Sequence, residues 1–160
     1  MGWRKHSSRI VYDNDWMTVR EDEVTNPGGG QNRYGHVHFK NVAVAVLPLD
    51  DNGCTRLVGQ DRYTLDQYSW ELPMGGAPLH EDPLEAARRE LREETGLLAA
   101  HWRELMRLHL SNSITDELGI VFVATGLTEG EADPEETEDL AVRTLPLAEA
   151  IEMARDGRIT

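Results

Sequence analysis

One segment near the middle of the chain combines the start and stop signals of a helix with a high density of acids. Asp82 is a good N-cap, Pro83 fits the first helical position, and Gly96 is a natural stop. Residues three and four apart share one side of a helix, so three acids fall on one arc: Glu90, Glu93 and Glu94. The fold must therefore contain a helix between Asp82 and Gly96 and must stabilise the three acids that share one side of it.

The acidic arc allows two interpretations. Three crowded carboxylates repel each other unless a cation lies among them, and oxygen ligands without Cys or His favour Mg²⁺ or Mn²⁺ over zinc. Arg89 lies one turn before Glu93 and can hold that side chain in place. The alternative is an ordinary solvated helix with surface ion pairs, because arginines are interleaved with the acids. Taken alone, the charge run favours this second interpretation.

Overall charge narrows the classes of partner. The chain has 160 residues and a formal net charge of −13, which suits one domain with a single core and argues against nucleic acid or an anionic membrane as partner. No apolar run is long enough to span a bilayer, and the N-terminus lacks a signal peptide. Cys54 is the only cysteine, so no intrachain disulfide can form, as is typical of cytoplasmic proteins.

The pattern of apolar residues predicts a mixed α/β protein. Extended segments are expected at residues 9–12, 16–24, 34–39, 42–47, 56–60, 102–110, 119–125 and 140–145, with polar loops at 63–69 and 126–137. The nearly continuous apolar run at 42–47 is typical of a buried central strand. A last helix begins at Pro146, and the natural chain could extend past Thr160. Mixed strands with one central and one late helix fit a three-layer α/β/α sandwich.

The segment from Gly75 to Leu97 resembles the Nudix box, G-x5-E-x7-R-E-U-x-E-E-x-G-U, where U is a bulky aliphatic residue. All nine specified positions match: Gly75, Glu81, Arg89, Glu90, Leu91, Glu93, Glu94, Gly96 and Leu97. Nine positions at fixed spacing leave little room for chance agreement. The chain is therefore identified as a member of the Nudix hydrolase superfamily. The resemblance implies the Nudix fold, an α/β/α sandwich with a mixed β-sheet.

The resemblance also implies roles for the box residues. Nudix enzymes hydrolyse a nucleoside diphosphate linked to another group, by attack of water on phosphorus. By resemblance, Glu90 and Glu94 are the main metal ligands, helped by a backbone carbonyl at Met74 or its neighbour. Glu93 is a further ligand or organises the attacking water, and Arg89 supports it. Two or more divalent ions are expected, Mg²⁺ in the first place and Mn²⁺ as the alternative.

A downstream segment points to a subgroup. Residues 135–140 resemble the E-x-E-D segment of ADP-ribose and nucleotide-sugar pyrophosphatases. This makes Glu136 the candidate general base and Glu138 an auxiliary metal ligand. Glu135 is almost as good a candidate base. A merely solubilising acidic loop is the alternative interpretation.

Candidate substrate contacts come from several segments. Residues 60–63 resemble the Q-x-R-Y signature of the same subgroup, which makes Arg62 a diphosphate or sugar contact, with a structural ion pair as the alternative. Glu71 belongs to a lead-in, residues 70–75, that resembles E-L-P-x-G. Residues 111–117 keep the Ser and Glu positions of an S-P-G-x-S-x-E stretch, including Glu117, but lack its proline and glycine. Nucleotide sugars such as GDP-mannose are therefore as well supported as ADP-ribose.

Residues 1–40 are expected to form an N-terminal strand arm, and residues 41–160 the Nudix core. The arm resembles one that exchanges contacts across a dimer and stacks on the nucleobase, a role open to Trp16, Tyr34 or His36. The leading hypothesis is a cytoplasmic, homodimeric, Mg²⁺-dependent pyrophosphohydrolase that splits a nucleoside diphosphate sugar into NMP and sugar phosphate. The alternatives are a hydrolase of nucleoside triphosphates or dinucleoside polyphosphates, and a non-catalytic nucleotide-binding Nudix module.

Overall fold

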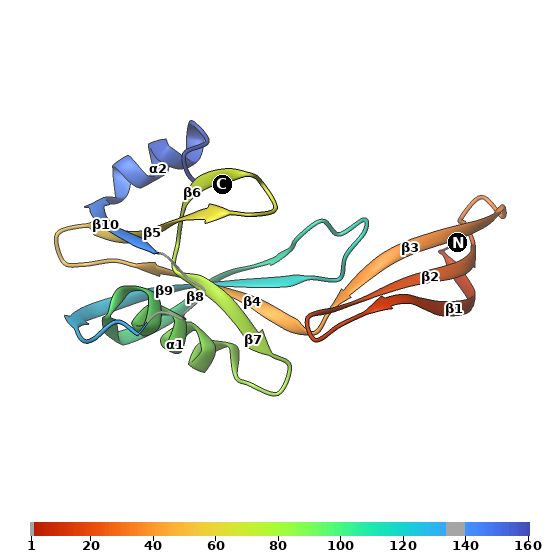
Figure 1. The fold of residues 1–160 in the computed structure, drawn as a ribbon, viewed down its shortest axis with the longest axis horizontal. Helices are drawn as coiled ribbons and strands as arrows, with labels where there is room; N and C mark the ends of the chain where they lie inside the picture. The colour runs from red at the N-terminus through yellow and green to blue at the C-terminus, as the bar shows by residue number, and fades with distance from the viewer. Residues whose placement is uncertain (1, 134–139) are drawn as a thin grey trace.

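Three sheets and two helices make up the described part of the chain, residues 2–133 and 140–160 of a computed structural model (Figure 1). The mixed sheet has the strand order β7-β4-β9-β8. Its strands are β4 (Asn41–Pro48), β7 (Met74–Pro78), β8 (Leu97–His109) and β9 (Leu118–Glu129). β4 runs antiparallel to β7 and parallel to β9, and so it occupies the interior position that the apolar run at 42–47 predicted.

Helix α1 (Pro83–Thr95) packs on one face of the mixed sheet, and its ends follow the predicted signals. The Asp82 carboxylate accepts a hydrogen bond of 2.8 Å from the Leu84 amide. Gly96 has φ of 72° and donates its amide to the Arg92 carbonyl, as a helix stop requires. Leu91 is completely buried and packs with Val44, Val46 and neighbouring strand residues in the main core.

A second, antiparallel sheet has the order β10-β5-β6 and carries the second helix. Its elements are β5 (Cys54–Arg62), β6 (Gln67–Glu71), β10 (Ala141–Pro146) and α2 (Leu147–Arg155). Leu57, Leu145 and Met153 form a smaller core between this sheet and α2. Figure 1 shows α1 and α2 on opposite sides of the two sheets, which confirms the predicted α/β architecture with a mixed sheet.

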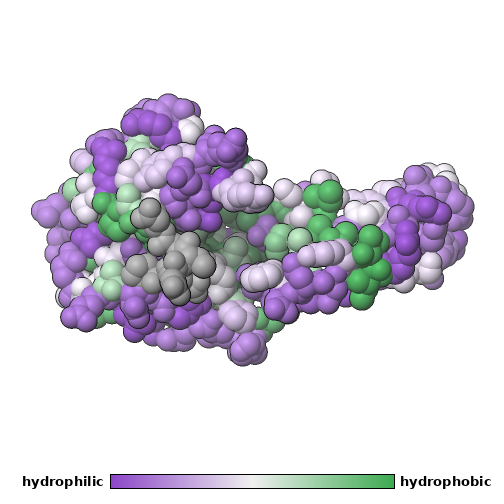
Figure 2. Space-filling model, viewed as in Figure 1, coloured by the Kyte–Doolittle hydropathy of each residue, from purple (hydrophilic) through white to green (hydrophobic). Residues whose placement is uncertain are grey.

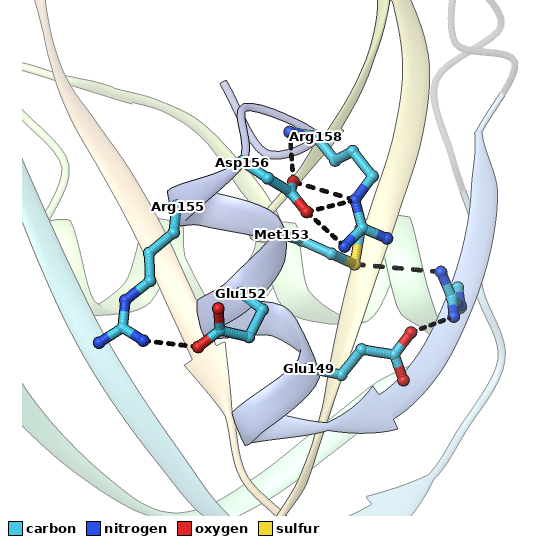
Figure 3. Close-up of polar contacts among 7 residues, drawn as sticks. Glu149, Glu152, Met153, Arg155, Asp156 and Arg158 are labelled. Atoms are coloured by element: carbon cyan, nitrogen blue, oxygen red, sulfur yellow. Dashed lines mark hydrogen bonds and ion pairs between the residues drawn. The ribbon is translucent and has the colours of Figure 1, made fainter.

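Polar contacts attach α2 to its sheet. The Leu147 amide donates to the Gly53 carbonyl at 3.0 Å, which satisfies the start of the helix without a side-chain cap. Glu149 accepts a hydrogen bond of 2.6 Å from Arg143 on β10 (Figure 3). Beyond the helix end, Asp156 pairs with Arg158, and Ile159 then bridges to Trp70 on β6. The C-terminal residues therefore close the edge of this sheet.

The N-terminal strands form a separate antiparallel sheet, in the order β1-β2-β3, that projects from the body as an arm (Figure 1). Its strands are β1 (Arg4–Asp13), β2 (Met17–Thr25) and β3 (Gln31–Phe39). The loop between β8 and β9 reaches back to the arm, where Val37 exchanges backbone hydrogen bonds with Ile114 and Asp116. Asp116 also lies 2.6 Å from the ring Nδ1 of His38.

Two of the loop predictions were wrong. Residues 63–69 were predicted to be a polar loop, yet β6 begins at Gln67, because this edge strand buries only alternate side chains such as Ser69. Residues 126–129 continue β9 instead of belonging to the acidic loop. The start of the box is also a strand, β7, whose glycines have little strand propensity and are held by pairing with β4.

Neither helix in the described ranges is long and apolar enough to cross a membrane.

Candidate functional site

Arg89 lies at the centre of the acidic arc. Its Nη1 is 2.8 Å from Glu90 Oε1 and 3.1 Å from Glu93 Oε2, and its Nη2 is 3.6 Å from Glu81 Oε2. Burial by itself lowers the pKa of the Arg89 guanidinium, but the carboxylates of Glu90 and Glu93 outweigh this effect and raise that pKa above its ordinary value. The box arginine is therefore the counter-charge that holds these acids together.

Glu90 lies directly against the backbone of β7. A Cβ atom built on Gly75 would overlap the Glu90 carboxylate, so that only a glycine leaves room for it. Arg89 completes the contact by donating to the carbonyl of Gly76 at 3.1 Å. The first residue of the box and its first metal-ligand candidate are thus neighbours in space, although 15 positions separate them in the sequence.

Glu94 is buried between α1 and β7. Its side chain is 3% exposed and accepts a hydrogen bond of 3.0 Å from the Met74 amide. The helical spacing correctly placed Glu94 beside Glu90, but it gave no sign that this carboxylate also fixes the start of β7. Glu94 therefore combines a position in the predicted ligand set with a contact that supports the fold.

The donor set of this cluster suits a hard divalent ion. Within residues 2–133 and 140–160, no three His, Cys, Asp or Glu side chains converge on one point, because Glu90 and Glu93 contact Arg89 whereas Glu94 contacts the Met74 amide. Glu90, Glu93 and Glu94 nevertheless share one stretch of α1, and β7 adds backbone carbonyls beside them. A set made only of oxygen atoms fits Mg²⁺ or Mn²⁺ and not zinc.

A cleft of about 420 Å³ extends from the box across β4 and β9. Small residues are among those that line it, including Ala43, Ala45 and Gly119, and Ala43 and Ala45 are only partly buried although β4 was predicted to be a buried central strand. Arg62, Met74 and Glu117 all border the cleft; these are residues that the sequence predicted as ligands or substrate contacts. Burial raises the pKa of the Glu117 carboxyl above its ordinary value.

Arg62 and Glu71 pair with each other across the β5–β6 hairpin. Arg62 Nε donates to Glu71 Oε1 at 2.8 Å, and Nη2 contacts Oε2, which makes the pair bidentate. The Glu71 side chain is only 5% exposed. This geometry favours the structural ion pair for Glu71, while Arg62 remains at the border of the cleft.

Trp16 lies beside the box within the same chain. Its indole is 68% exposed and borders a recess of about 570 Å³ between the arm and α1. The Asn14 side chain accepts from the Trp16 amide at 3.0 Å, and the Trp16 carbonyl accepts from the Lys40 amide at 2.9 Å. Lys40 and Asn41 border the same recess, although sequence reasoning missed both. Their only signal was their place between two predicted strands.

The other residues predicted for the site lie either in the arm or outside the described residues. Tyr34 donates to the Ser113 carbonyl, which ties it to the β8–β9 loop. The candidate base and auxiliary ligand, Glu136 and Glu138, lie outside the described residues, as does the alternative base, Glu135.

Comparisons with known proteins agree on one family. The NUDIX domain family matches residues 39–159, and the nucleoside diphosphate sugar hydrolase N-terminal domain matches residues 3–37. An ADP-ribose pyrophosphatase of Mycobacterium tuberculosis is 39% identical over 158 residues, which cover 96% of this chain and 75% of that protein. A CMP-5'-(N-acetyl-N-hydroxy-3-aminopropyl)phosphonate hydrolase of Streptomyces rubellomurinus is 31% identical and matches 99% of this chain and 76% of that protein.

The fold has a solved counterpart. The crystal structure of an ADP compounds hydrolase superposes with a TM-score of 0.87, covering 99% of this chain and 85% of that chain at 23% sequence identity.

The contact between Gly75 and Glu90 can be tested by adding one methyl group. Gly75→Ala should displace the Glu90 carboxylate and weaken Mn²⁺ binding by about tenfold or more, as measured by titration calorimetry. Folding should change little, because only the end of a flexible side chain must move. Gly35→Ala, on a strand where a Cβ meets nothing within 4 Å, is the control. Unchanged Mn²⁺ affinity in Gly75→Ala would contradict this account of the site.

Glu71→Gln tests whether the Arg62 pair is structural. The Glu71 side chain is 5% exposed but that of Arg62 is 35% exposed, so removing the Glu71 charge should lower the free energy of unfolding by about 1–2 kcal/mol, measured by urea denaturation. Glu104→Gln, which breaks the exposed pair with Arg107, should have little effect and serves as the control. A normal unfolding curve together with a raised KM would instead assign Glu71 to substrate binding.

Proposed function

The chain belongs to the NUDIX domain family, and from that premise we propose that it hydrolyses nucleoside diphosphate sugars. The reaction cleaves the diphosphate of ADP-ribose, GDP-mannose or a similar compound and gives NMP and a sugar phosphate. The match of residues 3–37 to the nucleoside diphosphate sugar hydrolase N-terminal domain carries this proposal, because it adds a subgroup-specific segment to the box. The two relatives act on a nucleotide that bears a second group, ADP-ribose in one case and a CMP-linked phosphonate in the other.

Magnesium is the proposed metal, with manganese as a substitute and two or more ions in the site. Glu90, Glu93 and Glu94 would hold them, together with the backbone of Met74. When bound, the ions neutralise charge on the diphosphate and make water a better nucleophile. The carboxylates already lie together around Arg89 and β7, so the chain supplies the ligands on one rigid helix.

The chain's own residues provide orientation and proton transfer. Water attacks phosphorus, the P–O bond to the leaving phosphate breaks, and a carboxylate accepts the proton of the water. We assign this carboxylate to Glu136, with Glu93, held by Arg89, as the alternative inside the box. Arg62 and Glu117 border the cleft, which supports assigning contacts with the diphosphate and the sugar to these two residues. Trp16 offers an exposed indole face for the nucleobase.

The arm is proposed as a dimerisation and substrate-binding unit, residues 1–40, that serves the hydrolase core, residues 41–160. Large apolar side chains that are more than half exposed gather on it: Trp3, Ile10, Val11, Tyr12 and Trp16. Figure 2 shows apolar surface on the arm between polar regions. Such surface is typical of an interface between subunits, and we propose a cytoplasmic homodimer that binds neither nucleic acid nor a membrane.

A substrate panel tests the proposed activity directly. Nucleotide sugars, ADP-ribose, nucleoside triphosphates and dinucleoside polyphosphates are assayed for products with Mg²⁺ and with Mn²⁺. We expect the highest kcat/KM for a nucleotide sugar, with NMP and sugar phosphate as products. Glu94→Gln should lower kcat at least about a hundredfold, because it removes a charged ligand. It should keep a near-normal melting temperature, because the amide oxygen can still accept the Met74 hydrogen bond. Preferred cleavage of a triphosphate or a dinucleoside polyphosphate would overturn the proposal.

The general base can be located by comparing single variants in single-turnover hydrolysis of the best substrate. If Glu136 is the base, Glu136→Gln should reduce the rate by about 10²–10⁴ while metal affinity stays near normal. Glu135→Gln should do much less, Glu138→Gln should shift the metal dependence, and Glu131→Gln is a nearby acidic control. A silent Glu136→Gln beside an inactive Glu93→Gln would place the base in α1 instead.

A further inference from the structure

Two consecutive glycines on β7 are each covered by a polar side chain, on opposite faces of the strand. Adjacent strand residues point to opposite faces, so Gly75 faces α1 whereas Gly76, paired with Ala43, faces the cleft. The Glu90 carboxylate occupies the space that a Cβ on Gly75 would fill. The Asn41 Nδ2 atom lies 2.5 Å from the position that a Cβ on Gly76 would take. Both contacts are possible only because β7 carries no side chain at either position.

Asn41 lies at the junction of the two hollows of the site. It borders the recess of about 570 Å³ between the arm and α1, which Glu90 also borders. It borders the cleft of about 420 Å³ as well, together with Arg62. Among the described residues that line the two hollows, only Asn41 and Gly76 belong to both. Because β7 is the edge strand of the mixed sheet, a ligand can pass around it from the side of Glu90 to the cleft.

The side-chain amide of Asn41 is available to a ligand. It is only partly buried, and within residues 2–133 and 140–160 it has no hydrogen-bond partner. The two cationic side chains that border the same recess are engaged elsewhere: Lys40 Nζ is 3.0 Å from Asp13 Oδ1, and Arg89 holds the box acids. An amide is neutral, so it can donate to an anionic oxygen without being drawn to the carboxylates nearby, as a lysine would be. It therefore suits a diphosphate bound beside acids.

We propose, on the basis of the proposed hydrolysis of nucleoside diphosphate sugars, that Asn41 is a substrate-binding residue whose amide donates to a diphosphate oxygen at the edge of β7. The nucleoside then lies in the recess that Trp16 borders, and the sugar lies in the cleft. Gly76 serves this contact, because a Cβ there would push the amide away from the junction. The box motif specifies no residue at position 76, so its spacing alone gives this glycine no role.

Substitution of Asn41 tests the contact. Asn41→Ala should raise KM for the best nucleotide sugar about tenfold, and Asn41→Asp should raise it further, because an acid repels the diphosphate. The value of kcat should stay near that of the wild type, since the contact forms in the ground state and in the transition state alike. Asn52→Asp, which adds the same charge on the exposed turn before β5, is the matched control and should leave KM unchanged.

Gly76→Ala tests the same contact without altering Asn41. The added Cβ should displace the amide and raise KM to a similar extent, and the double variant Gly76→Ala/Asn41→Ala should bind no more weakly than either single variant. Its Mn²⁺ affinity should stay normal, in contrast to that of Gly75→Ala, because the two glycines face opposite sides of β7. Additive losses in the double variant would overturn the proposal.

A direct binding measurement separates a substrate contact from a structural role. The ligand is an analogue of the best substrate in which a methylene group replaces the bridging oxygen of the diphosphate, and its dissociation constant is measured by calorimetry. This constant should rise in parallel with KM in the Asn41 variants, while their urea denaturation stays near that of the wild type. Variants that unfold more easily but bind the analogue normally would overturn the proposal.

The outcomes also separate this contact from the proposed activity. If a nucleoside triphosphate or a dinucleoside polyphosphate proves to be the best substrate, the same variants are measured with that compound. Weaker binding there would support the Asn41 contact to phosphate although the proposed activity had failed. Conversely, hydrolysis of nucleotide sugars with an unchanged KM in both Asn41 variants would overturn the contact and leave the proposed activity standing.

Discussion

The contact between the acidic side of α1 and the backbone of β7 is the constraint on which the rest of the site depends. Glu90 lies over a backbone that only glycine allows, Glu94 fixes the Met74 amide, and Arg89 holds Glu93 and the Gly76 carbonyl. Acids concentrated in this way would repel each other on an isolated helix. Arg89 of α1 supplies the counter-charge, and β7 supplies the Met74 amide and the Gly76 carbonyl, so these contacts together make the concentration of acids tolerable.

Sequence reasoning succeeded where the signals are local and failed where they depend on a distant partner. Both ends of α1 follow from Asp82 and Gly96, because capping involves residues within a few positions of each other. β7 could not be foreseen, since its glycines become a strand only by pairing with β4. The same limit explains the site: the box spacing identified Glu90 and Glu94, but the burial of Glu94 depends on β7. The Arg62–Glu71 pair likewise depends on the pairing of β5 with β6, whose first residues, 67–69, were predicted to belong to a loop.

The arm shows a similar limit, because the sequence alone could not predict which of its side chains share a face of the sheet. Its aromatic residues and its length were visible in the sequence, but β1 contains register shifts between Lys5 and Ser7 and between Ile10 and Tyr12. Each shift changes which side chains of β1 share a face with β2, so alternation alone could not place Ile10 beside Arg20. Trp16 differs from these residues, because the Asn14 side chain accepts from the amides of Trp16 and Met17 and so fixes a local turn beside a recess that box residues also border.

The arm and the body of the protein differ in how many of their buried polar side-chain atoms lack a hydrogen-bond partner. In the described part of the protein, two of the three unpartnered buried side-chain atoms belong to the arm, and the third is the hydroxyl of Thr55 in the body. The box acids, by contrast, have partners within the chain, because Arg89 contacts Glu90 and Glu93 and the Met74 amide donates to Glu94. On β2 of the arm, Arg20 Nε and Asp22 Oδ1 are buried without a hydrogen-bond partner among the described residues, although Lys5 Nζ lies 3.9 Å from the other carboxylate oxygen of Asp22. The turn around Trp16 and Lys40 joins the two parts. The recess that this turn borders is also bordered by Glu81, Arg89 and Glu90, so the arm and the box meet at one place within a single chain.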